Sequence, residues 1–464
     1  MARNGANRGI DYYPEQEPES AGHGLGKPIA AVGAVILIAG AIGGKIVYDA
    51  WQGPNQAASS SEPNMPPSSP EDIPSSTIPS SSSAKSSPTS SSPNKSSPTP
   101  TPTKASPTST LIPSIGVSVV VPPGATSSVP STDIDKKIAS NMIVGFDAST
   151  TSFDEIKHVV EDTGIGGVFL TNTQNGNKLY QRLSKLPEHL LLVSDEEGGQ
   201  VHRLADGFTP PSARQLGQMN LQRVQDYGKR EGQVMRACGV TLDLGPVLDI
   251  DNKRNDNNPN DVISHLDRSF GYNADTVISH AGAFIAGLHD AGVGATVKHF
   301  PDIGSASGAP DYPDNNTDAH AATTPNLSYL EGHGLLPHQK ILTDNSAEAV
   351  MASNATVPGL TKGPASISPE VVQLIRDGYG FKGATITDSL TALGGKNFVP
   401  RIPLPTAIAD SVKAGFDAPL FSFTTEQAIT RAIAKINNLI KTGQISASQI
   451  DDSSQRVDAL RNVG

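Results

Sequence analysis

Eight short apolar runs recur between residues 142 and 421, and segments with helical periodicity separate them. Strands that alternate with helices along a chain are typical of α/β folds with a parallel sheet. Eight such repeats over about 330 residues meet the requirement of a (β/α)8 barrel of the TIM type. We therefore expect one barrel over residues 134–464, with strands at residues 142–146, 166–170, 190–193, 240–244, 293–297, 347–351, 383–386 and 417–421.

The helical patterns between these runs predict the outer layer of the barrel. They include residues 221–237, 274–290 and 369–379, and two more patterns follow the last run at 425–442 and 446–461. We expect the last two helices to close the outer ring of the barrel.

Three of the apolar runs end in clusters of polar residues. Asp195-Glu196-Glu197 follows the third run, Lys298-His299 follows the fifth, and Thr387-Asp388-Ser389 follows the seventh. In a (β/α)8 barrel the carboxyl ends of all strands meet on one face, and that face carries the active site. An open doubly wound sheet is the structural rival, but it does not naturally account for so many polar strand ends. The clusters indicate one shared pocket, and hence an enzyme or the descendant of one.

An uncharged apolar run precedes the barrel at residues 28–44, between Lys27 and Lys45. Together with the apolar residues just after Lys45, it reaches the roughly 20 residues that a helix needs to cross a bilayer. More basic residues lie before this run (Arg3, Arg8 and Lys27) than directly after it (Lys45). This excess favours a cytoplasmic N-terminus and a barrel outside the cell.

A cleaved signal peptide is the alternative interpretation of the same run. The long leading segment and the lack of a clear small-x-small cleavage site favour an uncleaved anchor. We therefore expect a cytoplasmic segment at 1–27 and a transmembrane anchor at 28–50, with the chain held in the cell membrane by a single pass. Residues 51–133 are dominated by Ser, Pro and Thr. Such a segment buries too little apolar surface to fold, so it predicts a disordered linker.

Composition excludes several classes of function. The formal net charge of −11 argues against nonspecific binding of nucleic acid. Cys238 is the only cysteine, so no intrachain disulfide is possible, and we expect it to be a buried apolar residue. No zinc-ligand spacing, phosphate-binding loop or dinucleotide fingerprint is present. We expect neither a metal nor an organic cofactor, and we expect a monomer.

Five ordered motifs resemble those of glycoside hydrolase family 3. The family segment Asp-Gln-Glu-Gly-Gly-Arg-Val-x-Arg is similar to Asp195-Glu196-Glu197-Gly198-Gly199-Gln200-Val201-His202-Arg203, where Gln200 replaces the family arginine. The other four motifs are Pro246-Val247-Leu248-Asp249-Ile250, Arg268-Ser269-Phe270-Gly271, Lys298-His299-Phe300-Pro301, and Gly380-Phe381-Lys382-Gly383 followed by Thr387-Asp388-Ser389-Leu390. The resemblance spans residues 134–464 and is strongest to the single-barrel β-N-acetylglucosaminidases.

The resemblance implies a catalytic nucleophile and a set of sugar ligands. Asp388 matches the nucleophile, which attacks the anomeric carbon and forms a covalent glycosyl-enzyme. The alternative is that Asp388 caps the helix that follows it. The residues that match sugar-binding positions are Asp195, Arg203, Arg268, Lys298 and His299. The alternative for Arg268 and Lys298 is a buried structural network with Asp249 or Glu197.

The acid/base of the resembling subgroup is an Asp-x-His pair on the loop after Lys-His-Phe-Pro. Asp318-Ala319-His320 matches that pair, and a histidine beside a carboxylate suits proton transfer near neutral pH. The family continues with Gly-His-Gly after Lys-His-Phe-Pro, whereas this chain has Asp302-Ile303-Gly304.

Two hypotheses from different classes follow. The first is a membrane-anchored, retaining exo-glycosidase that hydrolyses β-N-acetylglucosaminides from the cell wall. The second is a catalytically weakened barrel that binds wall glycan or a protein partner, as the altered loop suggests. An active glycosidase for a different sugar remains a third alternative.

Overall fold

The structure of the chain is a computed structural model, and it describes residues 132–172, 176–204, 209–252, 261, 263–306, 323–395, 398 and 400–463. The predicted cytoplasmic segment, the predicted anchor at 28–50 and nearly all of the predicted linker at 51–133 lie outside these residues. Within the described ranges, no helix is both long and apolar enough to cross a membrane.

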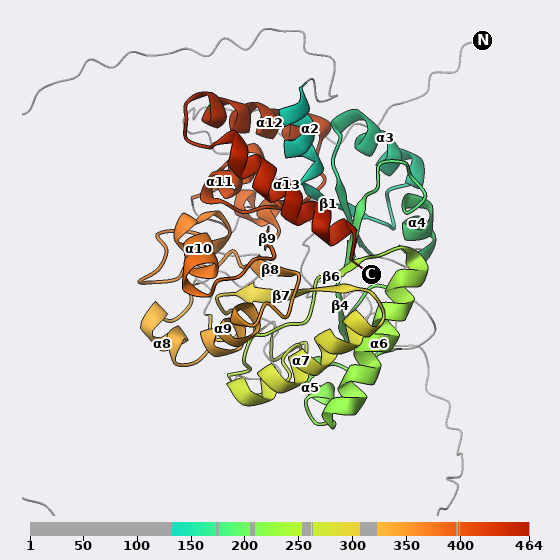
Figure 1. Cartoon of the computed structure of the whole chain (residues 1–464), viewed down its shortest axis with the longest axis vertical. Helices are drawn as coiled ribbons and strands as arrows, with labels where there is room; N and C mark the ends of the chain where they lie inside the picture. Colours follow the sequence, from blue (N-terminus) through green and yellow to red (C-terminus); the bar gives the residue numbers. More distant parts are fainter. Residues whose placement is uncertain are drawn as a thin grey trace, which may run out of the picture. The chain divides into compact units, whose positions relative to one another are not determined.

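Eight parallel strands form the centre of the molecule (Figure 1). They pair in the order β10-β1-β2-β3-β6-β7-β8-β9. Hydrogen bonds also join the first and last strands of this order, β10 and β9. Thr387 N donates to Ala418 O at 3.3 Å, and Asp417 N donates to Thr385 O at 3.0 Å. The result is a nearly closed barrel built from β1 (Ile143–Asp147), β2 (Gly167–Thr171), β3 (Leu191–Ser194), β6 (Leu242–Asp243), β7 (Gly294–Phe300), β8 (Ala349–Ala352), β9 (Ala384–Thr387) and β10 (Leu420–Ser422).

All eight predicted strands are therefore confirmed, with two differences in detail. Strand β7 extends to Phe300, so Lys298 and His299 belong to the strand and do not follow it. A two-stranded antiparallel hairpin, β4 (Glu196–Gly198) and β5 (Val201–His202), follows β3 and was not expected from the sequence.

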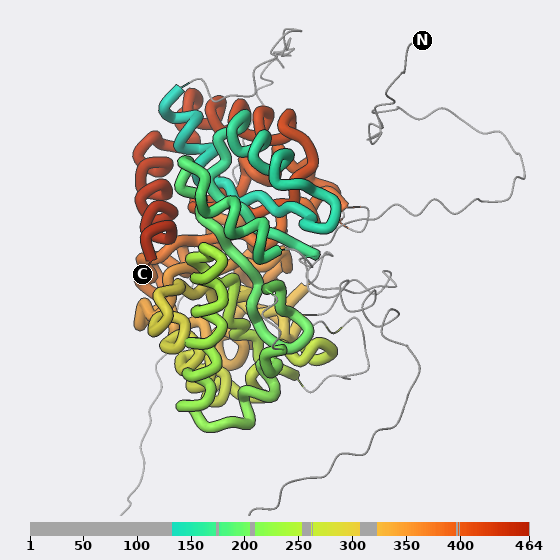
Figure 2. The backbone as a smooth tube through the Cα atoms, turned by 90° about the vertical axis from the view of Figure 1, so that its right-hand side faces the viewer, coloured from blue at the N-terminus to red at the C-terminus, as the bar shows by residue number. Residues whose placement is uncertain are grey.

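Helices surround the strands, with α6 packed along α7 and with α2 beside the C-terminal helices α12 and α13 (Figures 1 and 2). Their bounds are α2 (Asp133–Ser140), α3 (Phe153–Thr163), α4 (Gly176–Leu183), α5 (Ala213–Leu216), α6 (Leu221–Cys238), α7 (Ala274–Asp290), α8 (Leu327–Glu331), α9 (Leu335–Thr343), α10 (Pro369–Gln373), α11 (Leu404–Ala414), α12 (Glu426–Lys441) and α13 (Ala447–Arg461).

Local sequence signals set the ends of these helices. At α3, the hydroxyl of Ser152 accepts from the backbone N–H of Glu155, and the Glu155 carboxylate accepts from the N–H of Ser152. This reciprocal pair satisfies two N–H groups that a helix start otherwise leaves without partners. At the other end of α3, Gly164 has a φ of 70°, a left-handed conformation that costs glycine little. Cys238, the last residue of α6, is buried as expected.

The prediction that α13 completes the outer ring is wrong. Its Val457 and Leu460 belong to the buried cluster inside the barrel, together with strand residues such as Ile143 and Leu191. The Arg461 guanidinium donates to the carbonyl of Ser140, just before β1. Helix α13 therefore lies across the amino-terminal end of the barrel (Figure 1). Because α13 covers that end, the chemistry of the barrel belongs at the opposite end, where the strands terminate.

His338 on α9 is a buried histidine with no polar support among the described residues. Neither of its ring nitrogens has a hydrogen-bond partner there, and its ring lies edge-on to Phe300 with 5.4 Å between centroids. Burial lowers the pKa of His338 to about 3.

This histidine makes the fold sensitive to acid. As the pH falls below about 6.5, the unfolded chain protonates His338 and the folded chain does not, so stability is lost down to about pH 3. We expect His338→Leu to reduce the stability difference between pH 7.5 and pH 5 by about 2 kcal/mol. Urea unfolding at the two pH values measures this. The exposed His158→Gln serves as a control that changes little, and an unaltered pH dependence in His338→Leu would contradict the prediction.

Candidate active site

The carboxyl end of the barrel collects buried charged residues from several strands. Asp195 follows β3, Asp243 ends β6, Lys298 and His299 lie in β7, and Asp388 follows β9. All five side chains are buried. The structure thus brings the three polar clusters of the sequence to one end of the barrel, as predicted.

Glu197 is the centre of an ion network at this end. Its Oε1 lies 2.6 Å from Lys298 Nζ, and its Oε2 accepts from Arg268 Nε at 2.7 Å. Arg268 Nη2 also donates to Glu197 Oε1 at 3.0 Å, which makes the Arg268–Glu197 pair bidentate. Lys298 Nζ donates in addition to Asp195 Oδ1 at 2.7 Å. One carboxylate therefore holds two of the cations that the sequence singled out, Arg268 and Lys298.

The charges of this network reinforce one another. Burial alone would raise the pKa of Glu197, but Arg268 and Lys298 hold it well below its usual range. Burial would likewise lower the pKa of Lys298, but Asp195 and Glu197 raise it above its ordinary value. Glu197 and Lys298 are thus both ionised at neutral pH.

His299 is held in one tautomer by Asp249. Its Nδ1 lies 2.7 Å from Asp249 Oδ2, so Nδ1 carries the proton and donates to the carboxylate. Its Nε2 lies 3.1 Å from Arg268 Nη2 and accepts from that guanidinium. Asp249 also accepts from the backbone N–H groups of His299 and Ile303. Burial raises the pKa of Asp249 to about 6, with opposing contributions from these N–H groups and Arg268.

The two interpretations of Arg268 and Lys298 are therefore not exclusive. Both residues belong to a buried network with Glu197, which was the structural alternative, and both lie at the end of the barrel where substrate-binding donors belong. Arg203 approaches the same region less closely, with its Nη2 at 3.5 Å from Asp195 Oδ2.

Asp388 is buried directly after β9. Its backbone N–H donates to Ala352 O at 2.8 Å, and its Oδ1 accepts from the N–H of Ser389 at 2.6 Å. The short helix that follows, Leu390–Gly394, has Ser389 at its N-cap and no side-chain capping bond. Helix capping, the structural alternative for Asp388, therefore has no support from this helix. Asp318 and His320 lie outside the described residues, so their predicted roles stay predictions.

Asp302, which replaces the glycine of the family motif, is a buried anchor that sequence reasoning missed. Its Oδ1 accepts from Gly304 N at 3.2 Å, and its Oδ2 accepts from Ser305 N at 3.0 Å and from the Ser305 hydroxyl. Burial, together with the charge of Asp249, raises the pKa of Asp302 to about 7. The Asx-type sequence Asp-x-Gly-Ser was the available signal, since aspartate readily bonds the backbone two and three residues ahead.

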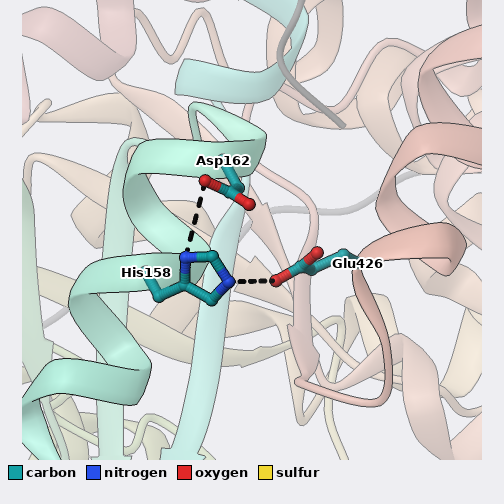
Figure 3. Close-up of side chains that lie close together, drawn as sticks. All are labelled: His158, Asp162 and Glu426. Atoms are coloured by element: carbon teal, nitrogen blue, oxygen red, sulfur yellow. Dashed lines mark ion pairs between the residues drawn. The ribbon is translucent and has the colours of Figure 1, made fainter. Parts of the chain in front are cut away.

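Two groups of side chains among the described residues are close enough to hold a metal ion. One is Glu196, His202 and Glu231, which lies at the hairpin β4–β5. The other is His158, Asp162 and Glu426, which joins α3 to α12 at the surface (Figure 3). Neither group contains a residue that the sequence assigned to catalysis or sugar binding.

A parallel eight-stranded barrel with a buried, charge-lined carboxyl end defines an enzyme of the TIM-barrel class. The model of the glycosyl hydrolase family 3 N terminal domain matches residues 133–460, and the chain belongs to this family. The resemblance stated from the motifs is thereby confirmed.

Relatives and solved structures agree with this assignment. The beta-hexosaminidase LpqI of Mycobacterium tuberculosis is 32% identical over 342 residues, which cover 70% of this chain and 82% of that protein. Its solved structure matches with a TM-score of 0.61, covering 71% of this chain and 94% of that one. The structure of a beta-N-acetylhexosaminidase from Beutenbergia cavernae, 26% identical, matches with a TM-score of 0.62 over 72% of this chain and 100% of that one.

The buried network predicts a large penalty when its central carboxylate is neutralised. Glu197→Gln leaves Arg268 and Lys298 short of negative charge, so we expect the free energy of unfolding to fall by about 3–5 kcal/mol. Glu161→Gln is the matched control, because Glu161 pairs with Lys157 at the surface and its loss costs at most about 1 kcal/mol. Denaturant unfolding compares the two variants, and equal effects would show that the network does not support the fold.

Proposed function

We propose that this chain is a retaining exo-β-N-acetylhexosaminidase that removes N-acetylglucosamine from cell-wall glycan. The observation that carries the proposal is Asp388, a buried carboxylate directly after β9, at the same end of the barrel as the Glu197 network. The names of the relatives, beta-hexosaminidase and beta-N-acetylhexosaminidase, support the sugar specificity.

In the proposed reaction Asp388 attacks the anomeric carbon as the bond to the leaving oxygen breaks. His320, with Asp318 beside it, protonates that oxygen and so releases the aglycone. His320 then removes a proton from water, which attacks the glycosyl-enzyme and frees Asp388. The sugar leaves with its original anomeric configuration because two inversions have taken place.

The remaining residues bind the sugar in this proposal. Arg203, Arg268 and Lys298 donate to its hydroxyls, and Asp195 accepts from them. His299, the fifth residue predicted to bind the sugar, faces Asp249 through Nδ1 and Arg268 through Nε2, and in this proposal it orients Arg268. Sugar hydroxyls both donate and accept, so a site needs both kinds of partner. Arg268 and Lys298 are preorganised, because Glu197 orients both side chains in the absence of a ligand.

Hydrolysis of a chromogenic N-acetyl-β-glucosaminide by the full chain tests the assignment. We expect Asp388→Asn to lower kcat by about a thousandfold or more, because no other group replaces a covalent nucleophile. We expect His320→Ala to lower it by about a hundred- to ten-thousandfold, the usual contribution of a general acid. Asp344→Asn is the control, because Asp344 pairs with Lys340 at the surface.

The other outcomes separate the rival functions. Activity lost only in Asp388→Asn would place the acid elsewhere than His320. Equal activity on β-glucosides or β-xylosides would contradict the preference for the N-acetyl group. No turnover in the parent, with sugar affinity that survives Asp388→Asn, would support the weakened binding barrel.

We also propose that residues 28–50 anchor the chain in the cell membrane with the barrel outside. The support is the uncharged run at 28–44 and the excess of basic residues before it. Fractionation of cells that express the full chain should place it in the membrane pellet, and deletion of residues 1–50 should release it. A mature chain whose mass lacks the first 50 residues would instead indicate a cleaved signal peptide.

A further inference from the structure

The back of the hairpin β4–β5 carries a second group of charged residues. Strand β4 alternates its side chains, so Glu197 and the preceding Asp195 join the ion network while Glu196 projects to the other side. His202 is the register partner of Glu196 on β5, and Glu231 reaches the same place from α6. Three elements thus bring an imidazole and two carboxylates together behind the predicted sugar site.

The distances in this group suit a metal ion better than direct hydrogen bonds. His202 Nε2 lies 3.4 Å from Glu196 Oε2 and 3.6 Å from Glu231 Oε2. An N–H···O hydrogen bond usually spans about 2.7–3.2 Å. Two ligands of a tetrahedral ion, each about 2.0–2.2 Å from the metal, lie about 3.4 Å apart. The three ligand atoms all lie within 4.8 Å of one another, so one ion can reach them together after small adjustments.

Surrounding groups orient these ligands as an outer shell does in metal sites. The Ser194 hydroxyl donates to Glu196 Oε1 at 2.6 Å, and the backbone N–H groups of Arg203 and Leu204 donate to Glu196 Oε2 at 3.2 and 3.4 Å. Such contacts fix the direction of a ligating carboxylate. The side chains of Glu196 and Glu231 are 0% and 4% exposed, whereas His202 is 14% exposed and leaves access for an ion.

The region also carries an excess of buried negative charge. Asp243 accepts from the backbone N–H of Glu196 through Oδ1, and its Oδ2 has no hydrogen-bond partner among the described residues. Glu231 lies beside Glu196 as well, so three carboxylates gather in the interior here, and a divalent cation would offset their charge.

Glu196 is also a departure of this chain from its family motif. The motif has glutamine at this position, and an amide supplies no anionic ligand oxygen. The change to glutamate is the one that makes a ligand set of one histidine and two carboxylates.

We propose that Glu196, His202 and Glu231 bind one divalent transition-metal ion, with zinc as the best fit and water in the fourth position. Zinc takes imidazole and carboxylate ligands in this number and geometry. Such an ion would link the hairpin to α6, and none of its three ligands is Asp388 or a member of the Glu197 network. By fixing Glu196 and His202, the ion would also fix their chain neighbours Asp195 and Arg203. Only the role of those two residues in sugar binding rests on the proposed function.

Zinc binding to the full chain, purified without a polyhistidine tag and stripped with a chelator, tests the site. We expect one zinc per chain by elemental analysis after dialysis, and a rise of the unfolding midpoint when zinc is added. Glu196→Gln restores the family residue and keeps its shape, and we expect it to lose this zinc and the rise. His202→Gln, at a partly exposed position, should do the same and covers the case in which Glu196→Gln fails to fold.

His158→Gln is the matched control, because it removes the histidine of the other candidate group (Figure 3). His158 is 67% exposed, which suits a weak surface contact. Zinc lost in His158→Gln but kept in Glu196→Gln and His202→Gln would overturn the proposal, as would a chain that binds no zinc. The measurement needs no substrate, so its failure and the failure of the glycosidase assignment are distinguishable.

Discussion

The ion network around Glu197 is the interaction on which the carboxyl end of the barrel depends. A buried cation without a partner costs several kcal/mol, and Glu197 is the carboxylate that faces both Arg268 and Lys298, with Asp195 as a second partner of Lys298. Glu197, Arg268 and Lys298 come from the hairpin, from the segment before α7 and from β7. Their mutual contacts therefore fix three separate parts of the chain relative to one another. The donors that face the predicted sugar are oriented by the fold itself, and this orientation exists before any ligand binds.

The hairpin β4–β5 matters because its two faces serve different purposes. A hairpin with strands of three and two residues has little stability of its own. On one face Asp195 and Glu197 enter the network, and on the other Glu196 is held by Ser194 and by the backbone of Arg203. A displacement of Glu196 on one face of the hairpin would therefore also displace Asp195 and Glu197 on the other. The two faces are therefore coupled through a few residues of backbone, and the region behind the hairpin can influence the site without contacting a substrate.

The sequence predicted the barrel well because strands that are buried on both faces read as continuous apolar runs. It missed the hairpin, since strands of two and three residues show no periodicity. It ended β7 too early, because the apolar run stops at Val297 and is followed by the polar Lys298 and His299. The position of α13 was wrong for a related reason: an amphipathic pattern shows that one face is buried but not what covers it. The pairing of Arg268 with Glu197, 71 residues apart, was one of two alternatives, because spacing along the chain does not choose between Glu197 and Asp249 as the partner.

The loop after β7 bears on whether the site is intact or decayed. Asp302 stands where the family has glycine, and a random loss of function would leave such a buried carboxylate poorly accommodated. Instead the two carboxylate oxygens of Asp302 accept from Gly304 and Ser305. Gly334 leaves room for this carboxylate, because a Cβ atom on residue 334 would lie 2.5 Å from the Asp302 carboxyl carbon. The next residue, Ile303, donates its N–H to Asp249, the same carboxylate that orients His299. The altered loop therefore begins from a point that is tied into the site. Such mutual adjustment among Asp302, Gly334 and Asp249 is what a maintained site requires, and it favours the active glycosidase over the weakened barrel.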